Sequence, residues 1–510
     1  MAIATSPPRL LSMEEYRTRW QPENWQFIII GPTSTWRQDW GEWEAIRDIV
    51  QNALDEAEVY RWGYDEKGLW ISDRGKGVAV ADFLLGPPKL KPDYARGKFG
   101  EGMKIAALAL IRKGYPVYIE TVGREIWIVF LEQKINGTAE TLAALWRPDG
   151  TKIGTKFHII GYTGSAFSDR FALNLPRSAI IAEGPSPVIR PVRRFNQLIA
   201  YQFPETPPSG WYEKGAGASR IFARDIYMRD INSLYSYNLW GFDMAPDRHG
   251  PKDEPDMWVD MGRLWCCVTR IDLLEKLLQM VRQPPVIETD ESHNVNMDSW
   301  AMGREPVTGK LYSDFIRDNG SVWREAWRSN FGDNAVIRTD DRWDGTVKHL
   351  GYVPVSVQWY VRDTLAKAIA TDADLVKASQ ERLREVEVIP GERLTSRQRA
   401  HLKLARAIVD DICRIRKVSA VHAAIIPPAS DRVRTAGMYS RVTQEIYIAS
   451  DQLERGHTAV DTVIHEIAHH TSGAEDLEEA HSAAMTQVAA RVVEETAARK
   501  FDDLLKEAVW

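Results

Sequence analysis

A glutamate flanked by histidines lies near the end of the chain, in the segment TAVDTVIHEIAHH (residues 458–470). His465 and His469 are four residues apart, so on a helix both imidazoles leave the same face. Imidazole suits Zn²⁺, and a catalytic zinc takes three protein ligands and a water. Glu466 stands beside the pair, where it would act as general base toward that water. The spacing therefore predicts a zinc site with hydrolytic chemistry, the alternative being a surface helix rich in histidine.

The third zinc ligand is expected just after this helix. Gly473 is placed to end the helix and to let the chain turn back into a second helix from about residue 475. His481 is the favoured third ligand, because a neutral nitrogen donor suits this ion. Acidic residues of the same segment stay open as alternatives, namely Glu475, Asp476, Glu478 and Glu479.

A second set of chemical groups lies on a predicted helix over residues 43–57. Its apolar residues recur at helical spacing, and Asp48, Asn52 and Asp55 fall together on the opposite face. Alone, these three residues are more typical of a solvated acidic face than of a site. The motifs that follow favour a ligand site.

Glycine-containing motifs follow this helix. A strand-like run over residues 70–72 ends at Asp73, and Gly75 and Gly77 come next, which suits a ligand that approaches the backbone closely. A glycine-rich loop then opens a helix over residues 105–111, where free N–H groups favour an anion. Its candidate residues are Gly97, Gly100, Gly102 and Lys104, the last with a solvated lysine as the alternative. Thr155 begins a strand over residues 156–160. The loop lacks the GK[ST] of a P-loop and is a poor dinucleotide fingerprint.

In this order, NALDEA, DRGKG, GKFGEG and GT resemble the motifs of the GHKL or Bergerat-fold ATPases over about residues 40–160. That superfamily includes DNA gyrase B subunits, HtpG-type chaperones, histidine kinases, MutL and MORC proteins. The resemblance implies an ATP site with Mg²⁺. It assigns Asn52 to Mg²⁺, Asp73 to the adenine amino group and Thr155 to a supporting water.

The resemblance also assigns the other candidates. Gly97, Gly100 and Gly102 correspond to the glycines of the family's lid loop and would wrap the phosphates, where Lys104 would add positive charge. Asp55, Gly75 and Gly77 belong to the implied nucleotide site. Asp48 stands where hydrolytic members carry a glutamate that orients or deprotonates the attacking water. Because aspartate is one methylene shorter, slow hydrolysis or a switch that mostly binds ATP are both open. Glu56 stands where the family usually has alanine.

Residues 221–242 are similar to the transducer domain that follows the ATPase domain in hydrolytic GHKL proteins. In those proteins a basic residue of that domain reaches the terminal phosphate. Arg248 is the first candidate for this role and Lys252 the second, and a solvated surface loop is the alternative.

At the other end, residues 430–495 resemble the zincin metallopeptidases. A strand-like stretch over residues 437–448 precedes the histidine-bearing helix, as the edge strand above a zincin active site would. The longer metzincin pattern HExxHxxGxxH does not fit, because the glycine comes one position late. The resemblance implies a reaction class and leaves the substrate open.

The length and composition of the chain are those of a folded protein with several domains. The chain has 510 residues, 44% of them apolar and 27% charged, which excludes large-scale disorder. The expected architecture is α+β, with a Bergerat sandwich over 1–165, a transducer-like α/β domain over 166–300, a partly helical connector over 301–390 and a mainly helical zincin over 391–510. Within the second region, residues 257–268 look like a strand. Three cysteines without CxxC spacing exclude a disulfide framework and a thiolate zinc site.

Together these patterns predict an ATP-binding or ATP-hydrolysing switch coupled to a zinc-dependent peptidase. The alternative is a chaperone- or MORC-like clamp on protein or DNA, with a degenerate or structural zincin. The expected partners are ATP, a protein or peptide substrate and, on ATP binding, a second copy of the chain. In that dimer residues 10–25 could exchange between protomers. The net charge of −6 gives no global attraction to nucleic acid. No apolar run is long enough for a membrane helix and no signal peptide is visible, so a cytoplasmic location is expected.

Overall fold

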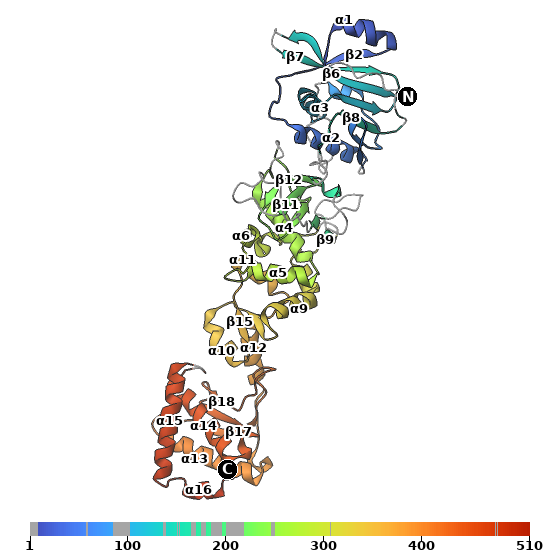
Figure 1. Ribbon diagram of the computed structural model, residues 1–510. Coiled ribbons are helices and arrows are strands. Elements are labelled where there is room, and N and C mark those ends of the chain that lie inside the picture. The colour runs from blue at the N-terminus through green and yellow to red at the C-terminus, as the bar shows by residue number, and fades with distance from the viewer. Residues whose placement is uncertain are drawn as a thin grey trace. The chain divides into compact units, whose positions relative to one another are not determined.

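A computed structural model describes residues 9–57, 60–84, 102–135, 139–149, 151, 153–164, 170–174, 180–184, 196–199, 219–245, 250–305, 308–474, 476 and 478–510. The chain forms two compact units, one of residues 1–181 with 186–257 and one of residues 182–185 with 258–510. The protein is mixed α+β, with an antiparallel sheet and a helical C-terminal region, as predicted (Figure 1). No helix in the described part of the chain is long and apolar enough to cross a membrane.

The first unit begins with an eight-stranded sheet in the order β2-β7-β6-β5-β8-β4-β3, with β1 pairing in parallel with β6. Its strands are β1 (Leu10–Leu11), β2 (Gln26–Thr33), β3 (Arg61–Asp65), β4 (Gly68–Ser72), β5 (Val117–Thr121), β6 (Arg124–Ile135), β7 (Ala139–Arg147) and β8 (Thr155–Ile160). The helices are α1 (Met13–Glu15), α2 (Glu42–Ala57) and α3 (Gly102–Arg112). The predicted helix over 43–57 and the strands beside Asp73 and Thr155 are confirmed.

Both faces of this sheet are buried. Alternate residues of β6 point to opposite sides: Ile126 and Ile128 pack with α2 and α3, whereas Trp127 and Val129 pack with the N-terminal segment. Trp20 and Trp25 of that segment are each 1% exposed. The segment over residues 10–25, expected as an exchangeable strap, therefore covers the sheet of its own chain.

A second sheet in this unit has the order β12-β11-β13-β10-β9. It consists of β9 (Ile180–Gly184), β10 (Asn196–Ile199), β11 (Ser219–Ala223), β12 (Ile226–Ile231) and β13 (Ser236–Leu239). The turn between β11 and β12 holds Arg224 and Asp225 at positive φ, and Asn238 stabilises it by accepting from the Asp225 amide. The tip of this hairpin packs on the first sheet's core through Ile226.

The strand predicted over residues 257–268 is wrong, because α4 (Glu254–Cys267) occupies this stretch. Its fully buried residues Met257, Met261, Leu264 and Trp265 recur at helical spacing, which the dense apolar composition obscured. Pro255 in the first turn suits a helix start.

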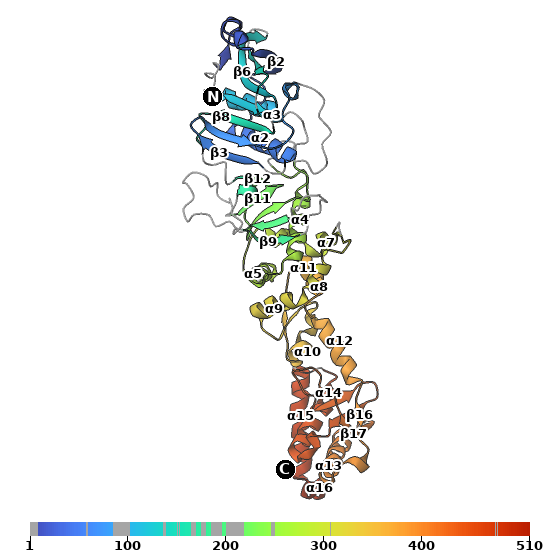
Figure 2. The same ribbon diagram turned by 90° about the vertical axis from the view of Figure 1, so that its right-hand side faces the viewer.

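The second unit continues with helices and two small sheets. Its middle part contains α5 (Ile271–Val281), α6 (Glu291–Asn294), α7 (Met297–Trp300), α8 (Asp314–Asp318), α9 (Gly320–Phe331), β14 (Ala335–Ile337), α10 (Asp344–His349), β15 (Val353–Val355), α11 (Trp359–Leu365) and α12 (Asp372–Leu383). The C-terminal part has a sheet in the order β16-β17-β19-β18, made of β16 (Glu387–Val388), β17 (Ala420–Ile425), β18 (Gly437–Ser440) and β19 (Glu445–Ala449). Its helices are α13 (Ser396–Ile412), α14 (Gly456–Ser472), α15 (Glu479–Ala497) and α16 (Asp502–Glu507). Figure 2 shows α14 and α15 packed side by side.

Candidate metal centre and nucleotide site

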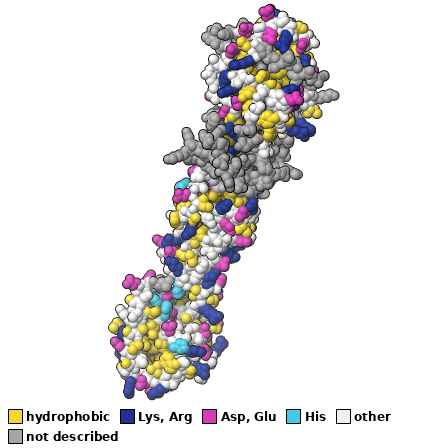
Figure 3. All heavy atoms as spheres, in the orientation of Figure 1, with side chains coloured by type: hydrophobic (Ala, Val, Ile, Leu, Met, Phe, Trp, Pro, Cys, Tyr) yellow, Lys and Arg dark blue, Asp and Glu magenta, His cyan; other side chains and the backbone are white. Residues whose placement is uncertain are grey.

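Helix α14 carries the predicted histidine pair. It packs Ala459, Val463 and Ile467 into the core of the C-terminal part, which leaves His465 and His469 on another face. Gly473 ends the helix with φ 69°, and its amide donates to the His469 carbonyl. The chain then turns back into α15, as predicted. Histidine side chains show on the surface of this part of the chain (Figure 3).

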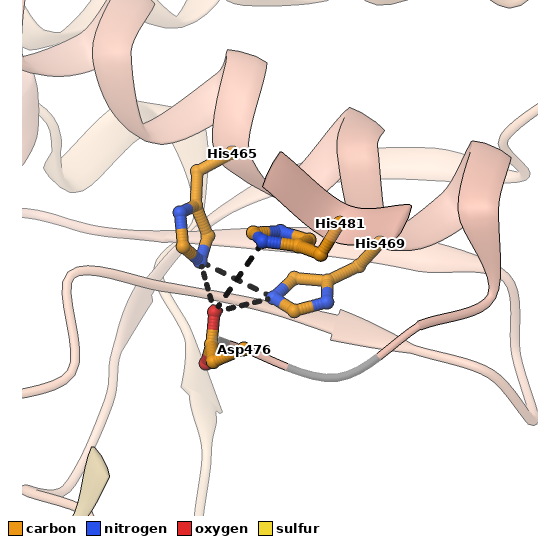
Figure 4. Close-up of side chains that lie close together, drawn as sticks. All are labelled: His465, His469, Asp476 and His481. Carbon is orange, nitrogen blue, oxygen red and sulfur yellow. Dashed lines mark hydrogen bonds and ion pairs between the residues drawn. The ribbon is translucent and has the colours of Figure 1, made fainter. Parts of the chain in front are cut away.

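Four side chains converge at this helix (Figure 4). They are His465, His469, Asp476 and His481, and one donor atom from each lies within 4.8 Å of all the others. Nε2 of His465 lies 3.2 Å from Nε2 of His469. Oδ1 of Asp476 lies 2.9 Å and 3.2 Å from these two nitrogens and 4.0 Å from Nδ1 of His481. Three imidazoles and a carboxylate oxygen thus surround one point.

This donor set fits Zn²⁺. Ligand atoms about 2.0–2.1 Å from a tetrahedral zinc lie about 3.3 Å from one another, close to the separations among His465, His469 and Asp476. The structure brings the favoured third ligand, His481, and one of the alternatives, Asp476, to the same cluster. Glu478 and Glu479 are described but do not belong to it, and Glu475 lies outside the described residues.

The surroundings prepare the histidines for a metal. Nδ1 of His469 lies 3.0 Å from the Ala474 carbonyl, so a metal that replaced the Nε2 proton would find Nδ1–H held by this carbonyl and the Nε2 lone pair directed into the cluster. Burial would raise the pKa of Asp476, but hydrogen bonds from His465 and His469 lower it well below its usual range. The carboxyl group is therefore ionised, as a metal ligand must be.

Glu466 belongs to α14, and its side chain is buried beneath the edge strand β18. Burial raises the pKa of Glu466 to about 7, although the nearby His465 and His469 lower it in part. A Cβ added at Gly437 would lie 2.7 Å from Oε1 of Glu466, so the strand passes directly over the carboxyl group. The edge strand predicted above this helix is confirmed.

His349 is a member of this site that the sequence did not reveal. It ends α10, and its Nε2 lies 3.2 Å from Oδ2 of Asp476. No sequence signal could have found it, since α10 and the histidine helix are far apart in the chain and no motif links them.

The polar side of α2 is more buried than a solvated face would be. Asp48 is 2% exposed, and its Oδ1 lies 3.5 Å from Nε of Arg47. A Cβ added at Gly102 would lie 1.9 Å from Oδ2 of Asp48, so α3 begins directly against this carboxylate. Lys104 is 3% exposed, so the solvated alternatives for both Asp48 and Lys104 are wrong. Asn52 donates to the Asp48 carbonyl within the helix.

Asp73 and Thr155 meet at the adjacent ends of β4 and β8. The Asp73 amide donates to the Thr155 carbonyl at 2.9 Å, and the Gly75 amide donates to Oδ1 of Asp73 at 2.7 Å. Burial raises the pKa of Asp73 against the lowering effect of backbone hydrogen bonds from Gly75 and Thr155. The hydroxyl of Thr155 lies 3.3 Å from that of Thr121, a neighbour that sequence reasoning missed.

Close packing explains two of the predicted glycines. Gly77 has φ 89°, and a Cβ there would lie 2.9 Å from Oγ1 of Thr121. A Cβ at Gly75 would lie 2.9 Å from Cβ of Glu56, which brings this loop onto the end of α2, near Asp55. The candidates Asp48, Asp73 and Thr155 thus lie on elements that pack against one another around α2.

The remaining candidates are Gly97, Gly100, Arg248 and Lys252. Gly97, Gly100 and Arg248 lie outside the described residues. Lys252 lines a cavity of about 360 Å³ together with Arg224, Asp243 and Asp256. The lining of this cavity contains none of the α2, β4 or β8 candidates.

No protein-family profile matches the chain, and no curated protein matches it. The assignment of both sites therefore depends on their residues and geometry.

Proposed function

We propose that the C-terminal part of this protein is a zinc-dependent peptidase of zincin type and that the N-terminal part is a GHKL-type ATP-binding switch that controls it. The observation that carries the proposal is the convergence of His465, His469 and His481 beside the buried Glu466. A surface helix rich in histidine would not bring a ligand from a second helix to the same point.

The chain's own residues suit peptide hydrolysis. A zinc ion held by the three imidazoles would supply a Lewis acid and an acidified water. Glu466 would accept a proton from that water on its carboxylate and deliver it to the leaving amine. The buried position of Glu466 beside the histidine cluster would place its carboxylate next to that water. The edge strand β18 passes over Glu466 and would fix the side from which a substrate approaches.

Elemental analysis of purified variants tests the metal centre. We expect one zinc per chain in the wild type, loss of zinc in His465→Ala, and strong weakening in His481→Ala. Glu478→Ala and Glu479→Ala should keep full occupancy, because neither belongs to the cluster. Glu466→Gln should keep zinc and lose hydrolysis of a casein-type substrate. A wild-type protein without zinc would overturn the proposal.

For the N-terminal part, the proposal assigns Asn52 to Mg²⁺, Asp73 to the adenine amino group and Asp48 to the attacking water. The partial burial of Asp73 beside Thr155 supports it, because a hydrogen bond shielded from water discriminates more strongly than one in water. Asp73→Asn should weaken ATP binding about 5- to 150-fold in calorimetry, since a mismatched donor costs about 1–3 kcal/mol. Asp65→Asn, at an exposed hairpin, is the matched control. Normal ATP binding by Asp73→Asn would overturn this part.

One observation favours a second function, a GHKL-driven clamp on protein or DNA with a structural metal. Asp476 adds a fourth protein donor to the three histidines, and structural zinc sites are typically closed by four protein ligands. In that case Glu466→Gln would change no activity. The peptidase assay with and without ATP separates the two functions.

A further inference from the structure

Asp476 lies between the histidine cluster and a residue from another part of the second unit. Its Oδ1 faces His465 and His469 (Figure 4). Its other oxygen, Oδ2, lies 3.2 Å from Nε2 of His349. The three imidazoles of the cluster belong to helices, whereas Asp476 belongs to the short connection between α14 and α15. Among these four donors it is therefore the one that could leave with the least rearrangement.

The region that carries His349 also contacts the loop before β18. The neighbouring Leu350 accepts a buried hydrogen bond of 2.8 Å from the Ser430 hydroxyl. Nearby, Arg432 donates to the Asp333 carbonyl at 3.0 Å and stacks on the ring of Tyr352. The loop that carries Ser430 and Arg432 leads into β18, the strand above Glu466. The region around α10 thus contacts both the fourth donor and the entry to the edge strand.

We propose that Asp476 is a removable fourth ligand that closes the zinc site, and that His349 is the positioning residue that holds it closed. This inference rests on the zinc site proposed above. With Asp476 bound, three imidazoles and a carboxylate complete a tetrahedral shell and leave no place for the catalytic water. Departure of Asp476 would free a position for one water, from which Glu466 would accept a proton. A movement of the α10 region would open the site by withdrawing His349 from Oδ2.

The size of the two effects differs for physical reasons. Removing Asp476 vacates a coordination position outright. Removing His349 weakens the closed state only by the strength of one contact between partly exposed side chains, since the side chain of His349 is 41% exposed. Such a pair changes an equilibrium by about two- to fivefold. Both variants should retain the metal, because three histidines suffice for a catalytic site.

The test uses the full-length protein loaded with Co²⁺, whose visible absorption reports coordination, and acetohydroxamate as a probe that needs an open position. We expect weak acetohydroxamate binding in the wild type, at least about tenfold tighter binding in Asp476→Ala, and about two- to fivefold tighter binding in His349→Ala. Asp476→Asn is the second variant, because an amide keeps the shape of the carboxylate but ligates poorly. His422→Ala is the matched control, since His422 also faces a carboxylate, Glu445, but outside the cluster.

Each outcome decides a separate point. Failure of the wild type to bind Co²⁺ would overturn the proposed zinc site itself. Bound Co²⁺ with equal acetohydroxamate affinity in the wild type and both Asp476 variants would overturn the fourth ligand and leave the zinc site standing. An effect of the Asp476 variants with none in His349→Ala beyond that of His422→Ala would overturn the positioning role of His349 and leave Asp476 as the fourth ligand.

Discussion

Gly102→Ala tests the contact between α2 and the start of α3. A Cβ at Gly102 would lie 1.9 Å from Oδ2 and 2.9 Å from Cγ of Asp48, against an ordinary contact of 3.4–4 Å. Because Asp48 is 2% exposed, its carboxylate has little space into which to move. Overpacking of a buried position typically costs about 1–3 kcal/mol. We therefore expect the opening free energy of α2 and α3 to fall by that amount.

Hydrogen exchange read by mass spectrometry suits this chain, because it measures each segment separately in a protein of several units. Amides of residues 42–57 and 102–112 should exchange about 5- to 150-fold faster in Gly102→Ala, and those of α14 should not change. Asp48→Ala in the same chain should restore most of the protection, as expected for two groups in direct contact. Gly391→Ala, where a Cβ meets open space, is the control. Unchanged exchange, or no recovery in the double variant, would refute the predicted contact.

Three further predictions follow from the two sites. Asp48→Asn should bind ATP as the wild type does but lose turnover in a phosphate-release assay, because an amide keeps the shape of the carboxylate and cannot accept a proton. Turnover at the wild-type rate would count against the proposed role of Asp48. A non-hydrolysable ATP analogue should raise the mass measured by light scattering, and an unchanged monomer would argue against dimerisation. Chelation of zinc should lower the melting temperature of the C-terminal part, since a ligand at 1,000 times its Kd stabilises the folded state by about 4 kcal/mol. The chelator should have no effect on His465→Ala.

Local patterns predicted the elements that carry the sites. The helix predicted from the apolar spacing over 43–57 is α2, and the predicted histidine pair lies on α14 with Gly473 as its C-cap. Both predictions were confirmed because helical periodicity and helix capping depend on residues close together in the sequence. The strand predicted over 257–268 was wrong because apolar residues are so frequent there that neither the helical nor the strand period can be recognised. In the structure this stretch is a helix with several buried sides.

The parts of the sites that escaped prediction depend on tertiary contacts. Thr121 reaches Thr155 only because β5 and β8 are paired in the sheet. His349 reaches Asp476 across a long stretch of sequence. The choice between His481 and Asp476 as third ligand could not be made from the sequence, because spacing allowed either, and the fold places both at the cluster.

If the N-terminal part is the GHKL-type switch proposed above, Asp48 takes the place of the glutamate of hydrolytic members, and the packing of this fold gives a steric reason for the shorter residue. Oδ2 of Asp48 already lies against the place where a side chain at Gly102 would begin. A glutamate needs room for one more methylene, and a carboxylate carried further in this direction would enter the first turn of α3. The close approach of α2 and α3 therefore favours the shorter residue. The same approach leaves little space for a water on this side of the carboxylate, which favours slow turnover. A switch that holds ATP for long periods suits a coupled peptidase whose zinc site, as proposed, rests closed.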